Sequence, residues 1–250
     1  MALIKTADEI AQLRAGGELL ARGVEALLAA VRPGITTNEL DAVFCASVKK
    51  SGGEPSFLNY RGYPRAVCLS VNDQVVHAIP GDRILENGDL LSVDCGLKYK
   101  GLYTDMARTV PVGEVSPEAM ALLETTKESL RVALKEMVPG KTTGDIGAAI
   151  QQFAEAKGYS VVRALVGHGV GHAVHEEPSI PNFGKRGSGA PLKAGMVIAV
   201  EPMVNIGGSE VIIEDDGWTV RTADGTLSAH FEDTIVITDA QPEIVTTHAS

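Results

Sequence analysis

The stretches LENGDLLSVD at residues 85–94 and LKAGMVIAVE at residues 192–201 repeat one pattern. Each has Leu-x-x-Gly, then an apolar run of β type, and ends in an acid, Asp94 in the first and Glu201 in the second. An ionised acid that closes a buried strand is costly unless a positive charge lies beside it. The repetition therefore predicts two related half-sites that face one cationic centre.

The internal repeat extends beyond these two acids. PGITTNEL at residues 33–40 matches PGKTTGDI at residues 139–146, an offset of 106 that Gly52 and Gly158 also keep. Each half then reads as a helix, a Pro-Gly stop, a second helix that starts at Thr-Thr, a glycine and strands. We expect helices from Thr6 to the Pro33-Gly34 stop and over about 38–50, 117–137 and 143–157. The chain is predicted to form one domain, residues 1–250, with pseudo-symmetric halves of about 1–112 and 113–250.

The fold class follows from the order of these elements. Short turns between consecutive strands predict largely antiparallel pairing. Helices that precede strands in each half predict an α+β architecture, with helices on one face of a curved sheet. The expected strands are RAVCLSV, QVVHAI, DLLSVDCGLKYKGLYTDMARTVPV, MVIAVEPMVNI, SEVIIED, WTVRT and LSAHFEDTIVIT.

Composition excludes several classes of function. The 250 residues carry a formal net charge of −10, which argues against non-specific nucleic-acid binding as the main activity but leaves room for a local basic patch. We expect no specific nucleic-acid site. The three cysteines, Cys45, Cys68 and Cys95, form no CxxC pair and predict reduced, mostly buried thiols. No apolar stretch approaches the roughly 20 residues of a membrane span. The N-terminal MALIKTADEI lacks a signal-peptide layout, so we expect a cytoplasmic protein.

Two acids are predicted to meet across a hairpin. A turn centred on Tyr99-Lys100 would place Asp94 directly opposite Asp105, with both side chains on one face. Two such carboxylates could not both stay ionised in a dry site. A divalent cation between them removes the conflict, and Mn, Fe, Co or Zn suits these ligands better than Mg once a histidine joins.

The second half supplies further candidate ligands. Glu201 ends the repeat strand, and Glu232 lies in LSAHFEDTIVIT on the same face as His230, with Asp233 on the opposite face as a competing candidate. His168 follows an apolar run between two glycines that permit close backbone approach. A zinc-protease motif fails at HEEPS, residues 175–179, because the second His is missing and Pro178 opposes a helix.

Five segments together resemble the methionine aminopeptidases, which share the pita-bread (creatinase/aminopeptidase) fold with aminopeptidase P and prolidase. They are NYRGYPRAVCLSVNDQVVHAIP, SVDCG with TDMARTV, GHGVGHAVHEEP, IAVEPMVN and SAHFEDTIVIT. The separation of only 33 positions between His168 and Glu201 leaves no room for the helical insertion of type II enzymes, which favours type I. The resemblance implies two divalent metal ions held by Asp94, Asp105, His168, Glu201 and Glu232. Asp105 and Glu232 would bridge the ions, Asp94 would chelate one, and His168 with Glu201 would complete the other.

The same resemblance implies an enzyme that removes the N-terminal methionine of nascent proteins when the next residue is small. Glu201 would also shuttle a proton, and His77 and His175 would contact substrate and stabilise the tetrahedral intermediate. The implied substrate pocket consists of Phe57, Tyr60, Tyr63, Cys68, His77, His175 and Trp218. Two departures from the bacterial pattern affect its shape: Phe57 stands where a cysteine can occur, and Val174 where an aromatic residue is often found.

The resemblance further implies a monovalent cation near Asn72 and Ser228, transient association with the ribosome, no membrane contact and a monomer. Three alternatives stay open. A proline-specific relative would be expected to carry a substantial N-terminal domain. A non-catalytic pita-bread protein would have lost ligand residues. A purely structural metal site leaves His77 and His175 without a role.

Overall fold

The computed structural model describes residues 4–247, so the outermost residues of the predicted domain, 1–3 and 248–250, lie outside the described part. Its long helices confirm the four predicted ones: α1 (Ala7–Ala30), α2 (Thr37–Ser51), α3 (Pro117–Ala133) and α4 (Thr143–Glu155). The short helix η2 (Leu134–Glu136) continues α3. Thr6 and Glu9 form a capping box at the start of α1. None of these described helices is long and apolar enough to cross a membrane.

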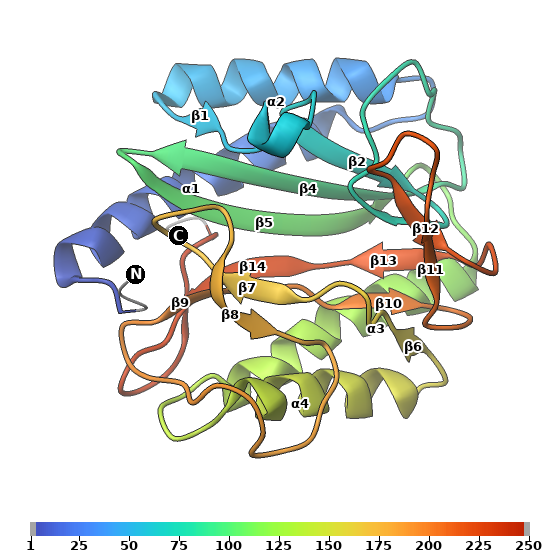
Figure 1. The fold of residues 1–250 in the computed structure, drawn as a ribbon. Helices are drawn as coiled ribbons and strands as arrows, with labels where there is room; N and C mark the ends of the chain where they lie inside the picture. The colour runs from blue at the N-terminus through green and yellow to red at the C-terminus, as the bar shows by residue number, and fades with distance from the viewer. Residues whose placement is uncertain (1–3, 248–250) are drawn as a thin grey trace.

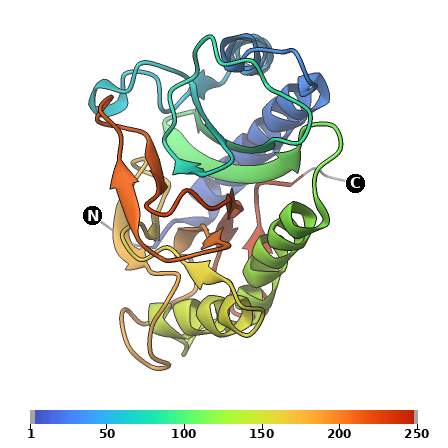
Figure 2. The same cartoon turned by 90° about the vertical axis from the view of Figure 1, so that its right-hand side faces the viewer.

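Strands from both halves form one large sheet, which Figures 1 and 2 show as a curved layer with α2 above it, α4 below it, and α1 and α3 behind it in the view of Figure 1. Its order is β1-β4-β5-β14-β9-β7-β8, and β2 pairs with β4 and β15 with β14. Every pairing in this sheet is antiparallel, as expected. The strands are β1 (Glu54–Pro55), β2 (Val67–Val71), β4 (Leu90–Tyr99), β5 (Leu102–Pro111), β7 (Gly167–Gly169), β8 (Glu176–Ile180), β9 (Val197–Val200), β14 (Glu232–Val236) and β15 (Glu243–Ile244).

Two three-stranded sheets complete the structure. One has the order β13-β10-β6, with β6 (Ser160–Val161), β10 (Met203–Asn205) and β13 (Ser228–His230). The other has the order β11-β12-β3, with β3 (Gln74–Val76), β11 (Val211–Ile213) and β12 (Val220–Thr222). In Figure 2 the β11–β12 hairpin stands on the side of the large sheet opposite the helices. The side of the large sheet away from the helices is therefore covered by loops and the β11-β12-β3 sheet, whereas the β13-β10-β6 sheet packs against α3 and α4.

Equivalent contacts recur in the two halves. Thr36 forms a β-bridge with Ile84, and Thr142 forms the matching one with Pro191. Both threonines close a capping box on the following helix. Each half also has its own apolar cluster: α1 and α2 pack on β2 and β4, and α3 and α4 pack on β9 and β14. The two halves join where Glu232 and Asp233 of β14 pair with Ala107 and Met106 of β5.

The predicted register of the β4–β5 hairpin is wrong. Asp94 pairs with Ala107, and Asp105 pairs with Gly96. The central residues of the turn are Lys100 and Gly101, with φ of 49° and 86°, because a tight two-residue hairpin needs positive φ at both positions and favours glycine at the second. Asp94 and Asp105 are therefore diagonal neighbours on one face, and Asp94 lies within its strand rather than at its end.

The strand predictions were incomplete. Five strands were not predicted. The strands β1, β6 and β15 have only two residues each, which is too short for a pattern, and glycines in β7 and a proline in β8 interrupt the strands beside the site. All three cysteines are free, and Cys68 and Cys95 are buried. This agrees with the expectation of reduced thiols.

Neighbouring glycines in α1 give a test of the packing between this helix and the sheet. A Cβ at Gly17 would lie 2.1 Å from the Val245 carbonyl oxygen, whereas a Cβ at Gly16 would lie 3.4 Å from the Tyr99 Cβ. Gly17→Ala should therefore destabilise the protein by about 1–3 kcal/mol. Gly16→Ala should be neutral or stabilise by up to about 1 kcal/mol, since alanine favours helices. Urea denaturation of both variants checks this, and equal effects would contradict the packing described.

Candidate metal centre

Five strands or strand ends bring the predicted ligands together. Asp94 lies on β4 and Asp105 on β5, the two strands of the first-half hairpin. In the second half, His168 lies on β7, Glu201 directly follows β9, and Glu232 begins β14. The order β4-β5-β14-β9-β7 makes these strands consecutive in the sheet. All five side chains line one cavity.

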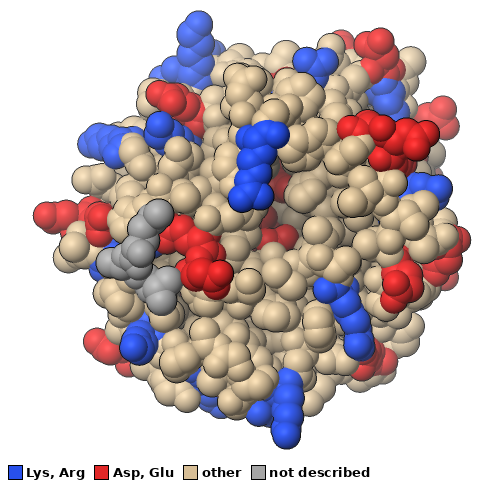
Figure 3. All heavy atoms as spheres, in the orientation of Figure 1, with Lys and Arg blue, Asp and Glu red and all other residues tan. Residues whose placement is uncertain are grey.

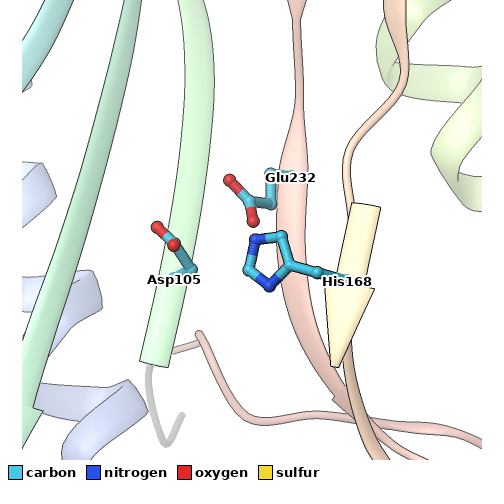
Figure 4. A group of neighbouring side chains, drawn as sticks. All are labelled: Asp105, His168 and Glu232. Atoms are coloured by element: carbon cyan, nitrogen blue, oxygen red, sulfur yellow. The ribbon is translucent and has the colours of Figure 1, made fainter. Parts of the chain in front are cut away.

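Three of these side chains meet closely. Ligand atoms of Asp105, His168 and Glu232 all lie within 4.8 Å of one another, and Figure 4 shows the side chains pointing toward each other from three strands. Glu201 joins them, with its Oε1 3.5 Å from His168 Nε2. All three residues of the close group are buried. This spacing suits a cation that contacts several of them.

The electrostatics of the group fit a divalent cation. Burial, reinforced for most of them by neighbouring carboxylates, raises the pKa of Asp94, Asp105, Glu201 and Glu232. Within residues 4–247, Asp94 Oδ1 and Glu232 Oε1 are buried without a hydrogen-bond partner. Buried oxygens of this kind need a donor or a cation, and mixed carboxylate and imidazole ligands suit Mn, Fe, Co or Zn. The residues present therefore fit a divalent metal site.

The His168 ring has the protonation state that a metal ligand requires. Its Nδ1 lies 2.9 Å from the Gly169 carbonyl oxygen, so the proton is on Nδ1 and Nε2 keeps its lone pair toward the site. Burial, assisted by His175, lowers the pKa of His168 to about 3. The ring is neutral at pH 7, as coordination requires.

Other side chains fix the backbone of the acids. The Asp105 N–H donates to Thr234 Oγ1 at 2.8 Å, and the Thr234 hydroxyl donates to the Asp105 carbonyl at 2.8 Å. The Asn182 amide donates to the Glu201 carbonyl oxygen at 3.0 Å. These bonds join Asp105 and Glu201 to neighbouring parts of the second half. Both acids are therefore held without using their carboxylate oxygens.

Beside the acids, the cavity of about 210 Å³ is lined by the predicted substrate-binding residues. In Figure 3 it opens as a hollow near the middle of the face, with acidic atoms inside. Phe57, Tyr63, Cys68 and Val174 pack together in a buried cluster, and Tyr60 and Trp218 pack against it. The Tyr63 and Trp218 rings meet edge to face at 5.2 Å. One side of the cavity is thus apolar and aromatic, and the other is acidic.

His175 and His77 face this cavity from two loops. His175 Nδ1 lies 2.9 Å from the Tyr60 hydroxyl, and its ring centroid lies 4.3 Å from that of His168. His77 follows β3 directly and has a left-handed φ of 62°, a strained backbone for a residue with a side chain. His77 is therefore not part of a regular strand. Burial, with a smaller effect from His175, lowers the pKa of His77 to about 4.

Sequence reasoning missed two residues beside the site. Arg61 lines the cavity, and its guanidinium lies 5.4 Å from the Tyr60 ring centroid. It sits in an irregular turn with φ of 50°, where no periodicity indicates a direction. His230 is buried with both ring nitrogens unpartnered in the described residues, and its Nε2 lies 3.7 Å from Glu201 Oε2. The sequence did contain a signal for His230, because the alternation of side chains along a strand places His230 on the same face as Glu232.

The competing candidate, Asp233, lies elsewhere. Its Oδ1 accepts a hydrogen bond from the Arg108 guanidinium at 2.7 Å and another from the Thr246 hydroxyl at 2.8 Å. The pairing with Arg108 gives this buried carboxylate a positive partner. Asp233 therefore has a structural explanation that the cavity acids lack.

The fold and this donor set define a metallopeptidase, and the chain belongs to metallopeptidase family M24, which matches residues 11–239. It is 47% identical over 246 residues to a methionine aminopeptidase of Clostridium perfringens, covering 98% of this chain and 99% of that protein. The crystal structure of methionine aminopeptidase from Rickettsia prowazekii matches with a TM-score of 0.96 and 40% identity, covering 98% and 99% of the two chains.

A prolidase from Pyrococcus furiosus has the same fold at 24% identity, with a TM-score of 0.81 over 99% of this chain and 66% of its own. Methionine aminopeptidases and prolidases thus both have this pita-bread architecture, which confirms the predicted fold.

Proposed function

We propose that this protein is a type I methionine aminopeptidase, which removes the initiator methionine when the next residue is small. The observation that carries the proposal is the meeting of four buried carboxylates and His168 beside an apolar cavity. The strong similarity to methionine aminopeptidases over the full chain supports the same activity. We further propose that residues 1–250 form one catalytic domain of two related halves, 1–112 and 113–250, which the shared sheet supports.

In this proposal Asp94, Asp105, His168, Glu201 and Glu232 would hold two divalent ions. Bound divalent ions supply Lewis-acid polarisation of the scissile carbonyl and a water of lowered pKa. Glu201 would accept at a carboxylate oxygen the proton that the attacking water loses, and would return that proton to the leaving amine as the C–N bond breaks. The site would also favour a substrate with a free α-amino group, because the unprotonated amine can serve as a further ligand to a bound divalent ion. This preference explains cleavage at the chain end.

The histidines act on the carbonyl side of the substrate. With the Tyr60 hydroxyl donating to His175 Nδ1, the neutral His175 ring carries its proton on Nε2. That N–H is then available to donate to the carbonyl oxygen as negative charge develops on it. His77, also neutral at pH 7, contributes a second polar group from the opposite loop. Both residues orient substrate, and neither is needed to hold the ions.

The methionine side chain would occupy the pocket formed by Phe57, Tyr60, Tyr63, Cys68 and Trp218. Aromatic edges and a thiol suit a polarisable thioether. We also propose a monovalent cation near Asn72 and Ser228, where the Asn72 carbonyl accepts the Ser228 N–H at 3.0 Å. The proposed partners are N-termini of nascent chains, reached in the cytoplasm by a monomer that contacts the ribosome transiently.

The activity is tested with four peptides: Met-Ala-Ser, Met-Lys-Ser, acetyl-Met-Ala-Ser and Ala-Pro-Ser. Only Met-Ala-Ser should be cleaved efficiently by the manganese-loaded enzyme, with kcat/KM for Met-Lys-Ser lower by about tenfold or more, since a pocket discriminates strongly against a side chain it cannot solvate. Blocking the amine should remove activity because the free amine is recognised. Cleavage of Ala-Pro-Ser alone would make the protein a proline-specific relative and overturn the proposal.

A further inference from the structure

The loop between β7 and β8 has two sides with different partners. Val174 packs in the apolar cluster of the cavity and His175 lines the cavity. On its other side, His172 contacts Glu9 and Glu176 contacts Lys5, both in the N-terminal segment. The position of His175 therefore depends on a short loop that is attached to residues far away in the sequence.

The Glu176 carboxylate holds the backbone of this loop through hydrogen bonds. Its Oε1 accepts the backbone N–H groups of His172 and Ala173, the latter at 2.9 Å. Its Oε2 lies 2.6 Å from Lys5 Nζ, and the two side chains are only 6% and 1% exposed. Although burial opposes ionisation, the hydrogen bonds from Lys5 and the two amides leave the pKa of Glu176 lowered. The charged Glu176 carboxylate thus fixes the backbone of His172 and Ala173, shortly before His175.

The N-terminal segment that supplies these contacts is itself held firmly. The Lys5 N–H donates to the Gly195 carbonyl at 2.8 Å, and the Lys5 side chain crosses Gly171, where a Cβ would lie 2.5 Å from Lys5 Cε. Glu9 Oε1 lies 2.7 Å from His172 Nε2, while its other oxygen closes the capping box of α1. Residues 5–9 form a strap across the outer side of the loop.

We propose that Lys5 and Glu9 are positioning residues for His175, so that the N-terminal strap sets the geometry of the reaction. This inference rests on the proposed function. On the inner side the loop is held by the Tyr60–His175 contact, by the packing of Val174 and by the Tyr103 N–H, which donates to the Gly171 carbonyl. Without the strap, Glu176 loses its cation and the amides lose a fixed acceptor. A displacement of about 1 Å at a catalytic group can cost roughly 10²-fold in rate.

A double-mutant cycle tests the inference in the full chain loaded with manganese. Lys5→Met should lower kcat for Met-Ala-Ser about tenfold with little change in KM, because the effect is on the orientation of His175. Manganese content should be unchanged. In a His175→Ala background the same substitution should have almost no further effect, since coupled residues are not additive. Glu177→Gln, at the exposed neighbour of Glu176, is the matched control and should behave as wild type.

Several outcomes would overturn the inference. An unchanged kcat in Lys5→Met removes the link to His175, and so does a loss that is equally large in the His175→Ala background. If Lys5→Met does not fold, His172→Ala replaces it, because the half-exposed His172 ring contacts Glu9 without carrying a buried charge. The same non-additivity is expected, and additive losses contradict it. If wild type itself fails to cleave Met-Ala-Ser, the proposed function fails rather than the strap.

Discussion

Replacing Asp105 by asparagine should abolish hydrolysis of methionyl peptides and reduce the amount of bound divalent metal. Asp105 belongs to the closest group of candidate ligands, and asparagine keeps its size but removes the negative charge. Loss of a group that acts as part of a catalytic unit typically costs about 10⁴-fold or more in kcat. Kinetics on Met-Ala-Ser and elemental analysis of anaerobically purified protein measure both effects.

The same substitution should not unfold the protein. The bonds between Asp105 and Thr234 use the Asp105 backbone and survive the change. In chelator-treated protein, Asp105→Asn should raise the Tm, because burial and the charges of Asp94 and Glu201 disfavour ionised Asp105. Asp215→Asn, at an exposed acid, is the control. An active Asp105→Asn variant with full metal content would contradict the ligand set.

Local signals made most of the fold predictable. The capping boxes at Thr6 and Thr36 and the glycines at the helix ends define helix boundaries through contacts within a few residues. The internal repeat then relates the halves, because one arrangement of helix and strand is used twice. The acids could be selected because a carboxylate in an apolar β run has few explanations besides a cation.

Features that depend on tertiary contacts could not be predicted in the same way. The hairpin register depended on which two residues form the turn, and a difference of one position moved the partner of Asp94 from Asp105 to Ala107. His77 and Arg61 have left-handed backbones, so strand or helix periodicity gives no information about where their side chains lie. The contact between Lys5 and Glu176 joins residues 171 positions apart and leaves no local pattern.

Replacing His175 by alanine should lower kcat by about 10²-fold or more while metal content stays unchanged, the scale of lost acid-base or electrostatic help. His77→Ala should behave similarly, because both rings line the cavity without belonging to the close ligand group. Tyr60→Phe removes only the partner of His175 Nδ1. Its loss should be smaller, about three- to tenfold, as expected for one hydrogen bond of about 0.5–1.5 kcal/mol.

Together, the activities and metal contents of the variants His175→Ala, His77→Ala and Tyr60→Phe distinguish a role in substrate orientation from a role in metal binding. If His175→Ala lost manganese in proportion to its activity, the histidine would be a ligand and the proposed division of roles would be wrong. If Tyr60→Phe were as inactive as His175→Ala, the tyrosine hydroxyl itself would contact the reacting atoms. A graded loss at constant metal content is expected only when Tyr60 orients His175 and His175 acts on the substrate, since a contact one step removed from the reaction transmits part of the effect.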